Sequence, residues 1–158
     1  MKWFFHTDLS MSNLFIRVFL GVVMLPHGLQ KLLGWYGGKG FAATIDAFGA
    51  NYHVPAAITL LVIAAESFGA IGLIIGFMTR FCAFGVLCNM IGAIYLVHWP
   101  HGFFMNWFGK QAGEGFEFHL LAIGMALALM AGGAGGLSVD RYITKRLYPE
   151  RIRSDFQR

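Results

Sequence analysis

Four apolar stretches, each about long enough to cross a lipid bilayer, constrain the fold of this chain more than any other feature. They cover residues 13–33, 55–77, 81–99 and 115–133. A helix that crosses a bilayer needs roughly 20 apolar residues. Inside hydrocarbon the backbone has no water to bond to, so segments of this length must be helices. The sequence therefore predicts an all-α protein, a bundle of four transmembrane helices.

The composition agrees with a membrane environment. Of the 158 residues, 57% are hydrophobic and 13% are charged, whereas soluble domains contain roughly a quarter charged residues. We therefore expect membrane lipids around the chain and no soluble domain of any size. There is no basic stripe interleaved with exposed aromatic residues, which gives no support to nucleic acid as a partner.

The distribution of lysine and arginine predicts the orientation. The end of the chain after the fourth stretch is basic, with Arg141, Lys145, Arg146, Arg151, Arg153 and Arg158. Lys2 and Arg80 fall on the same predicted side, whereas the two long loops hold Lys39 and Lys110. By the positive-inside rule both termini are cytoplasmic. We predict a four-helix transmembrane domain over residues 1–140 and a basic cytoplasmic tail over 141–158.

Small residues predict how the helices pack. Gly72 and Gly76 form a small-xxx-small pair, and Gly124, Ala128 and Gly132 are spaced by four in the last helix. Such residues let membrane helices approach closely. Glu117 falls on the face of Gly124 and Ala128, so we expect it to point inward. His119 lies about 200° around the helix from Glu117, and we expect it to face another side or a partner.

Ionisable residues at membrane depth carry the functional information, because they are costly there. His27 and Lys31 share a helix face, and His98 and Glu117 lie at a similar depth in the predicted outer half. Glu66 lies deeper, near the middle of its helix. We expect His27, Lys31, Glu66 and Glu117 to line one cavity that opens towards the outer leaflet.

Each of these residues also has a structural interpretation. Glu66 must be protonated or paired, with Lys31, His27 or Arg17 as its candidate partners. Lys31 can instead extend alone to the outer interface, and His98 can cap the end of its helix. Arg17 either reaches the cytoplasmic surface or pairs with Glu66 or Asp140.

Asn89, the two cysteines and the histidines each support a narrower prediction. We expect Asn89 to hydrogen-bond between helices. Cys82 and Cys88 lie on different faces of one helix and cannot bridge each other there. The histidines show no metal-ligand spacing, so we predict no metal site; metal or haem would need ligands from separate helices, for example His27 and His98.

A series of short motifs resembles the DoxX family of four-helix bacterial and archaeal membrane proteins. The motifs occur in order over nearly the whole chain: Arg17-Val-Phe-Leu-Gly21, Pro26-His27-Gly28-Leu-Gln-Lys31-Leu, Gly34-Trp-Tyr-Gly37-Gly38, Ala65-Glu66-Ser-Phe-Gly69, Gly76-Phe-Met-Thr79-Arg80, His101-Gly-Phe-Phe104, Gly115-Phe-Glu117-Phe and Gly136-Leu-Ser-Val-Asp140. The family takes its name from association with a thiosulfate:quinone oxidoreductase, and its members are linked with thiol and oxidative-stress systems. The resemblance therefore implies a multi-pass protein of the bacterial or archaeal inner membrane.

Two functional hypotheses follow. In the first, the chain is a subunit of a quinone-linked oxidoreductase. His27, Lys31 and His98 bind the quinone, and Glu66 and Glu117 take or supply protons. In the second, the chain is a non-catalytic subunit that assembles or anchors other membrane or periplasmic proteins, and the polar residues only fix how the helices pack.

Overall fold

The computed structural model describes residues 10–147, and every regular element in that range is a helix. In chain order the elements are α2 (Met11–Leu33), η1 (Trp35–Gly37), α3 (Phe41–Tyr52), α4 (Ala56–Ala64), η2 (Ala65–Gly69), α5 (Ala70–Ile75), α6 (Thr79–Ala93), η3 (Ile94–His98), η4 (Trp99–His101), α7 (Glu117–Gly132) and α8 (Val139–Leu147). Two of them, η2 and η3, are π-helical turns inside longer helices.

Three helices are long and apolar enough to cross a membrane: Met11–Leu33, Ala56–Ile75 and Thr79–His101. A fourth apolar helix, Glu117–Gly132, is shorter. All four begin and end within a few residues of the predicted stretches. The chain is therefore a helical membrane protein of several spans. Lys2 and the tail arginines at 151, 153 and 158 lie outside the described residues.

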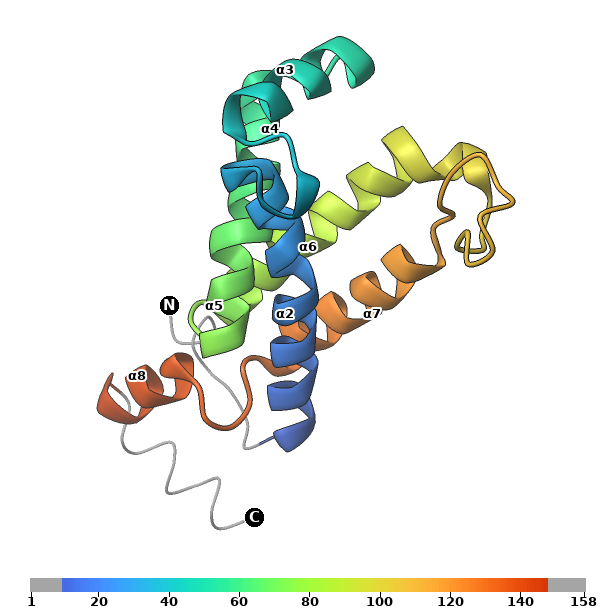
Figure 1. The fold of residues 1–158 in the computed structure, drawn as a ribbon. Helices are drawn as coiled ribbons and strands as arrows, with labels where there is room; N and C mark the ends of the chain where they lie inside the picture. The colour runs from blue at the N-terminus through green and yellow to red at the C-terminus, as the bar shows by residue number, and fades with distance from the viewer. Residues whose placement is uncertain (1–9, 148–158) are drawn as a thin grey trace.

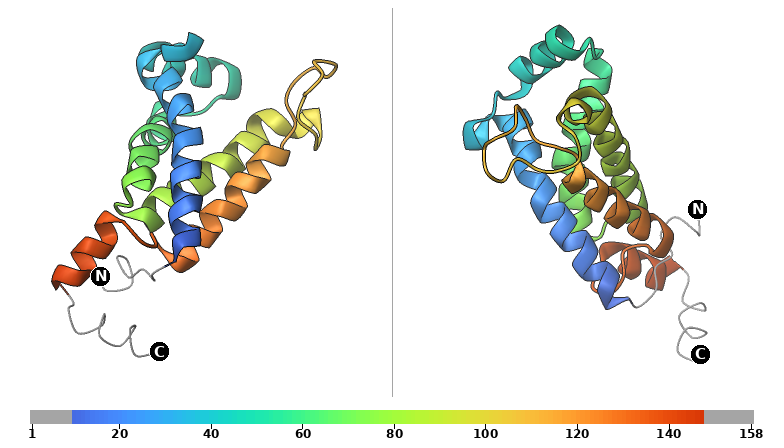
Figure 2. Two further views of the ribbon diagram at one scale, coloured as in Figure 1. Left: turned by 60° about the horizontal axis from the view of Figure 1, so that its bottom comes forward. Right: turned by 90° about the vertical axis from the view of Figure 1, so that its right-hand side faces the viewer.

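The helices form two antiparallel pairs that cross (Figures 1 and 2). In one pair α2 packs against η2 and α5, and in the other α6 packs against α7. The pairs meet near the end of the bundle where α8 lies, which we call the α8 end. They diverge towards the opposite end, which carries α3 and the loop between η4 and α7 and which we call the α3 end.

The core lies where the two pairs cross, and it contains Leu20, Met24, Ala70, Leu73, Ala83, Val86, Met90, Ala122, Ala126 and Leu129. Gly28 allows the backbones of α2 and η2 to touch, because a β-carbon at this position would overlap the backbone of Glu66 and Ser67. Gly72 and Gly76 are buried as predicted.

The prediction for the last helix is wrong. Gly124 and Ala128 are exposed, and the buried face of α7 instead carries His119, Ala122, Ala126 and Leu129. Small residues occur on both faces of this helix, so residue size alone did not identify the face that packs.

Charged side chains bind the helix ends at the α8 end. The buried guanidinium of Arg17 donates five hydrogen bonds to the carbonyls of Leu73, Ile74, Ala134, Gly136 and Leu137. Arg80 donates to the carbonyls of Met130 and Ala131. The carboxylate of Asp140 accepts from the backbone amides of Met78 and Thr79. Arg17 thus bonds to carbonyl groups, and neither of its expected alternatives, a pair with a carboxylate or a position at the surface, describes it.

We expect Gly28→Ala to destabilise the bundle, because the added methyl group would force α2 away from η2. Overpacking of a core costs roughly 1–3 kcal/mol, which thermal unfolding in detergent would detect. The matched control is Gly124→Ala, since a β-carbon at Gly124 meets nothing within 4 Å. Equal stability of the two variants would contradict the close approach of α2 and η2.

Candidate functional site

An ion pair between two helices forms the centre of the candidate site. The Lys31 ammonium lies 2.5 Å from Oε2 of Glu66, and Glu66 is only 5% exposed. The second carboxylate oxygen, Oε1, accepts a hydrogen bond of 2.6 Å from the side-chain amide of Asn89 on α6. Lys31, Glu66 and Asn89, which we call the Lys–Glu–Asn triad, thus join three helices. The prediction that Glu66 has a cationic partner from another helix is confirmed, as is the interhelical bond of Asn89.

The local backbone explains how these groups meet. Glu66 lies within the π-helical turn η2, and such turns are rare and frequently mark functional sites. Gly28, one turn before Lys31, allows α2 to touch the backbone of this turn. Lys31 can therefore reach the carboxylate of Glu66, and the prediction that it extends alone to the interface is wrong.

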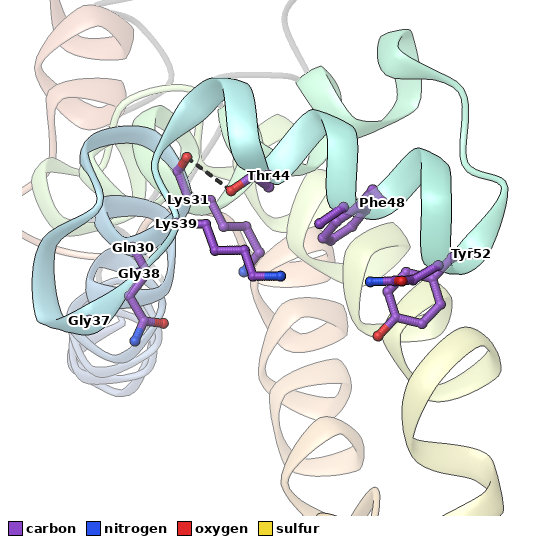
Figure 3. Close-up of a pocket in the computed structure, with 10 residues that line it drawn as sticks. Gln30, Lys31, Gly37, Gly38, Lys39, Thr44, Phe48 and Tyr52 are labelled. Atoms are coloured by element: carbon purple, nitrogen blue, oxygen red, sulfur yellow. Dashed lines mark hydrogen bonds between the residues drawn. The ribbon is translucent and has the colours of Figure 1, made fainter.

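A cavity of about 300 Å³ lies beside Lys31 at the α3 end. Its lining residues come from the end of α2, the segment 37–39 and α3: Gln30, Lys31, Gly37, Gly38, Lys39, Thr44, Ala47, Phe48, Asn51 and Tyr52. Figure 3 shows the side chains of Lys31 and Lys39 running in the same direction, with Phe48 and Tyr52 on α3 beside them. Among the four residues expected to share a cavity, Lys31 lines this one.

The other predicted residues lie elsewhere. Glu117 accepts hydrogen bonds from the amide of Met105 (2.9 Å) and the indole of Trp107 (3.2 Å), so it holds the loop that precedes α7. His27 is exposed on α2. His98 donates from Nδ1 to the carbonyl of Glu114 at 2.8 Å.

His119 is the residue that sequence reasoning misplaced. It is only 7% exposed, and its ring lies 4.0 Å from that of His98, centroid to centroid. It was expected to face another side than Glu117 or a partner; it does lie on another side, and that side is the buried face of α7. Helical spacing showed that His119 and Glu117 lie on different faces, and the error was in choosing which of these faces packs.

These observations define a class: a multi-pass helical membrane protein with a buried ion pair next to a cavity. The family model described as DoxX matches residues 12–99, and the chain belongs to the DoxX family. The match includes Lys31, Glu66, Asn89 and His98 and ends before Glu117 and His119.

Two relatives match over most of the chain. A Haemophilus influenzae protein, named "Uncharacterized protein", is 31% identical over 144 residues, which are 90% of this chain and 89% of that one. A Bacillus subtilis protein, named "Putative oxidoreductase CatD", is 28% identical over 140 residues, which are 89% of this chain and 92% of that one. No solved structure matches the chain significantly.

We expect Lys31→Met to destabilise the protein, because it leaves the carboxylate of Glu66 buried without its cation. Removal of one partner of a buried ion pair costs about 3 kcal/mol or more. The double variant Lys31→Met/Glu66→Gln should recover much of that loss, since no charge is then left unpaired. Unfolding titrations in mixed micelles would measure both. A double variant less stable than Lys31→Met would show that the pair does not dominate the energetics here.

Proposed function

We propose that the chain is the membrane subunit of a quinone-linked redox system and that the cavity beside Lys31 receives the quinone head group. The observation that carries this proposal is the contact between a cavity-lining cation, Lys31, and a buried carboxylate, Glu66, at 2.5 Å. The name of the Bacillus subtilis relative, an oxidoreductase, supports a redox role. The electron donor is a partner protein in or outside the membrane.

The cavity has the properties that a quinone ring requires. Its volume of about 300 Å³ lies at the lower end of the range for small-molecule pockets, which suits one substituted ring whose tail remains in lipid. Phe48 and Tyr52 offer aromatic walls, and Lys31, Lys39 and Gln30 offer hydrogen-bond donors for the quinone oxygens.

The Lys–Glu–Asn triad supplies the proton chemistry. Reduction of a quinone to a quinol consumes protons as well as electrons, and general acids must lie within hydrogen-bond reach of the oxygens. Lys31 donates a proton to a quinone oxygen at the cavity, and the neutral amine takes a proton back from water that reaches the cavity, because the adjacent carboxylate of Glu66 favours the ammonium form. Participation of Glu117, His27 and His98 stays a prediction, since none of the three lines this cavity.

The proposal also includes the topology. Four helices cross the bacterial or archaeal inner membrane, α7 being the shortest, and both termini lie in the cytoplasm. Helix α8 carries Arg141, Lys145 and Arg146 at the α8 end, so by the positive-inside rule that end is cytoplasmic. The cavity then opens at the outer face of the membrane.

Reporters fused near Met1 and after Arg158 should both be active in the cytoplasm, and a reporter inserted at Lys110 should be active outside. The reason is that four spans return the chain to the side on which it started. Fusions at Val54 and Lys110 should give the same side. A terminus found on the outer face would contradict the four-span topology.

Quinone binding tests the function directly. A short-chain ubiquinone or menaquinone analogue should bind purified wild-type protein saturably, and Lys39→Gln should weaken binding by about tenfold, because a hydrogen bond from a charged donor contributes roughly 1.5–3 kcal/mol. Phe48→Ala should also weaken it.

The matched controls are Lys110→Gln and Phe68→Ala, an exposed lysine and an exposed aromatic residue outside the cavity. If wild-type protein binds neither quinone saturably, or if the control variants lose as much affinity as the cavity variants, the quinone proposal fails. The assembly role would then be the better explanation of the Lys–Glu–Asn triad.

A further inference from the structure

Helix α8 is attached to the point where two membrane-spanning helices end. The backbone amide of Asp140 donates a hydrogen bond of 2.9 Å to the carbonyl of Gly76. The carboxylate of the same residue accepts from the amides of Met78 and Thr79, and these partners belong to the turn between α5 and α6. The first turn of α8 therefore lies at the depth where the chain leaves the bilayer. Figures 1 and 2 show α8 running at a steep angle to α2, as a helix along the membrane surface would.

One side of α8 packs on the bundle, and an apolar stripe lies next to that side. Asp140 and Thr144 are buried and form the packed side. At about 100° per residue, Val139, Ile143 and Leu147 fall in one row beside it. The first two are partly exposed, and Leu147 is 60% exposed. In a protein that spans a membrane, an exposed apolar row at this depth can be covered by lipid acyl chains.

The remaining side of α8 is positively charged. Lys145 and Arg146 are exposed, and Arg141 is half-buried. The single acidic residue of the helix, Asp140, is already bonded to backbone amides at the start of α6. Within residues 10–147 none of the three basic side chains forms an ion pair with a carboxylate. The guanidinium of Arg146 lies 5.4 Å from the ring centre of the exposed Tyr142, so it stays on the outer side of the helix. Three positive charges are therefore left without a negative partner.

We propose that α8 is an interfacial helix that binds the headgroups of anionic phospholipids through Arg141, Lys145 and Arg146. A basic side next to an apolar side is typical of helices that lie in the membrane interface, with the apolar side buried about 5–10 Å into the boundary between headgroups and acyl chains. Anionic headgroups attract lysine and arginine at this depth. An acidic protein would pair with the basic side but would leave the apolar row unexplained.

Lipid binding by the full-length protein tests the proposal. Protein purified in a neutral detergent is titrated with short-chain phosphatidylglycerol, phosphatidylcholine or inorganic phosphate, and native mass spectrometry counts the bound molecules. We expect phosphatidylglycerol to bind saturably and at least about tenfold more tightly than phosphatidylcholine, without competition from an equal concentration of phosphate. Lys145→Gln should reduce this preference about fivefold. The matched control is Lys110→Gln, an exposed lysine in the loop before α7, which should leave the preference unchanged.

The depth of α8 provides a second measurement, which does not depend on charge. Nitroxide labels are attached to Leu147→Cys or Lys145→Cys in a Cys82→Ala/Cys88→Ala background, and the protein is placed in vesicles that contain phosphatidylglycerol. The label on the apolar row, at 147, should be more accessible to oxygen, which concentrates in hydrocarbon. The label on the basic side, at 145, should be more accessible to a water-soluble nickel complex.

Three outcomes would overturn the proposal: equal affinity of the wild-type protein for the two lipids, an unchanged preference in Arg141→Gln/Lys145→Gln/Arg146→Gln, or a label at 147 that is in water. An acidic protein would then be the better candidate for the basic side. The comparison of lipids on wild-type protein decides the matter even if a variant fails to fold. Because neither measurement involves a quinone, failure of the quinone proposal would leave these results unaffected.

Discussion

The absence of water inside a bilayer leaves the last carbonyls of every helix in need of a partner, and the architecture of this protein depends on how that need is met. Arg17 binds carbonyls in the last turn of α5 and in the segment after α7, and Arg80 binds the last carbonyls of α7. The carboxylate of Asp140 accepts hydrogen bonds from the backbone amides at the start of α6, which also have no partner within the helix. These bonds fix the helix ends relative to one another, and the opposite ends are thereby free to diverge.

Two groups of polar residues towards the α3 end, the Lys–Glu–Asn triad and the rings of His98 and His119, differ in whether their polar atoms have hydrogen-bond partners. In the Lys–Glu–Asn triad each carboxylate oxygen has a donor, and the positive and negative charges balance. Such a site leaves no charge and no carboxylate oxygen without a partner. By contrast, the ring of His98 is held by a carbonyl, and the ring of His119, which lies against it, has an enclosed nitrogen without a hydrogen-bond partner.

Sequence reasoning succeeded where hydrophobic length or the cost of a buried charge decides the structure. It located the apolar helices to within a few residues, and it named Lys31 among the partners of Glu66. It failed where packing decides between helix faces that look alike, as for Gly124 and His119 on α7. The contact between His98 and His119 depends on a π-helical turn and on the course of the loop before α7, and neither has a recognisable sequence signal. The cavity depends on α3, a short helix that lies outside the four predicted stretches.

Both π-helical turns contain a polar residue of interest, Glu66 in η2 and His98 in η3. A π-turn accommodates one residue more than a regular helix over the same span. Loss of that residue would restore regular geometry and keep the orientation of the helix beyond the turn, but the side chains of the turn itself would change position. Glu66 would then move relative to Asn89 on α6. The length of these two helices is therefore as much a part of the sites as their side chains, and a single-residue deletion there is a more severe change than most substitutions.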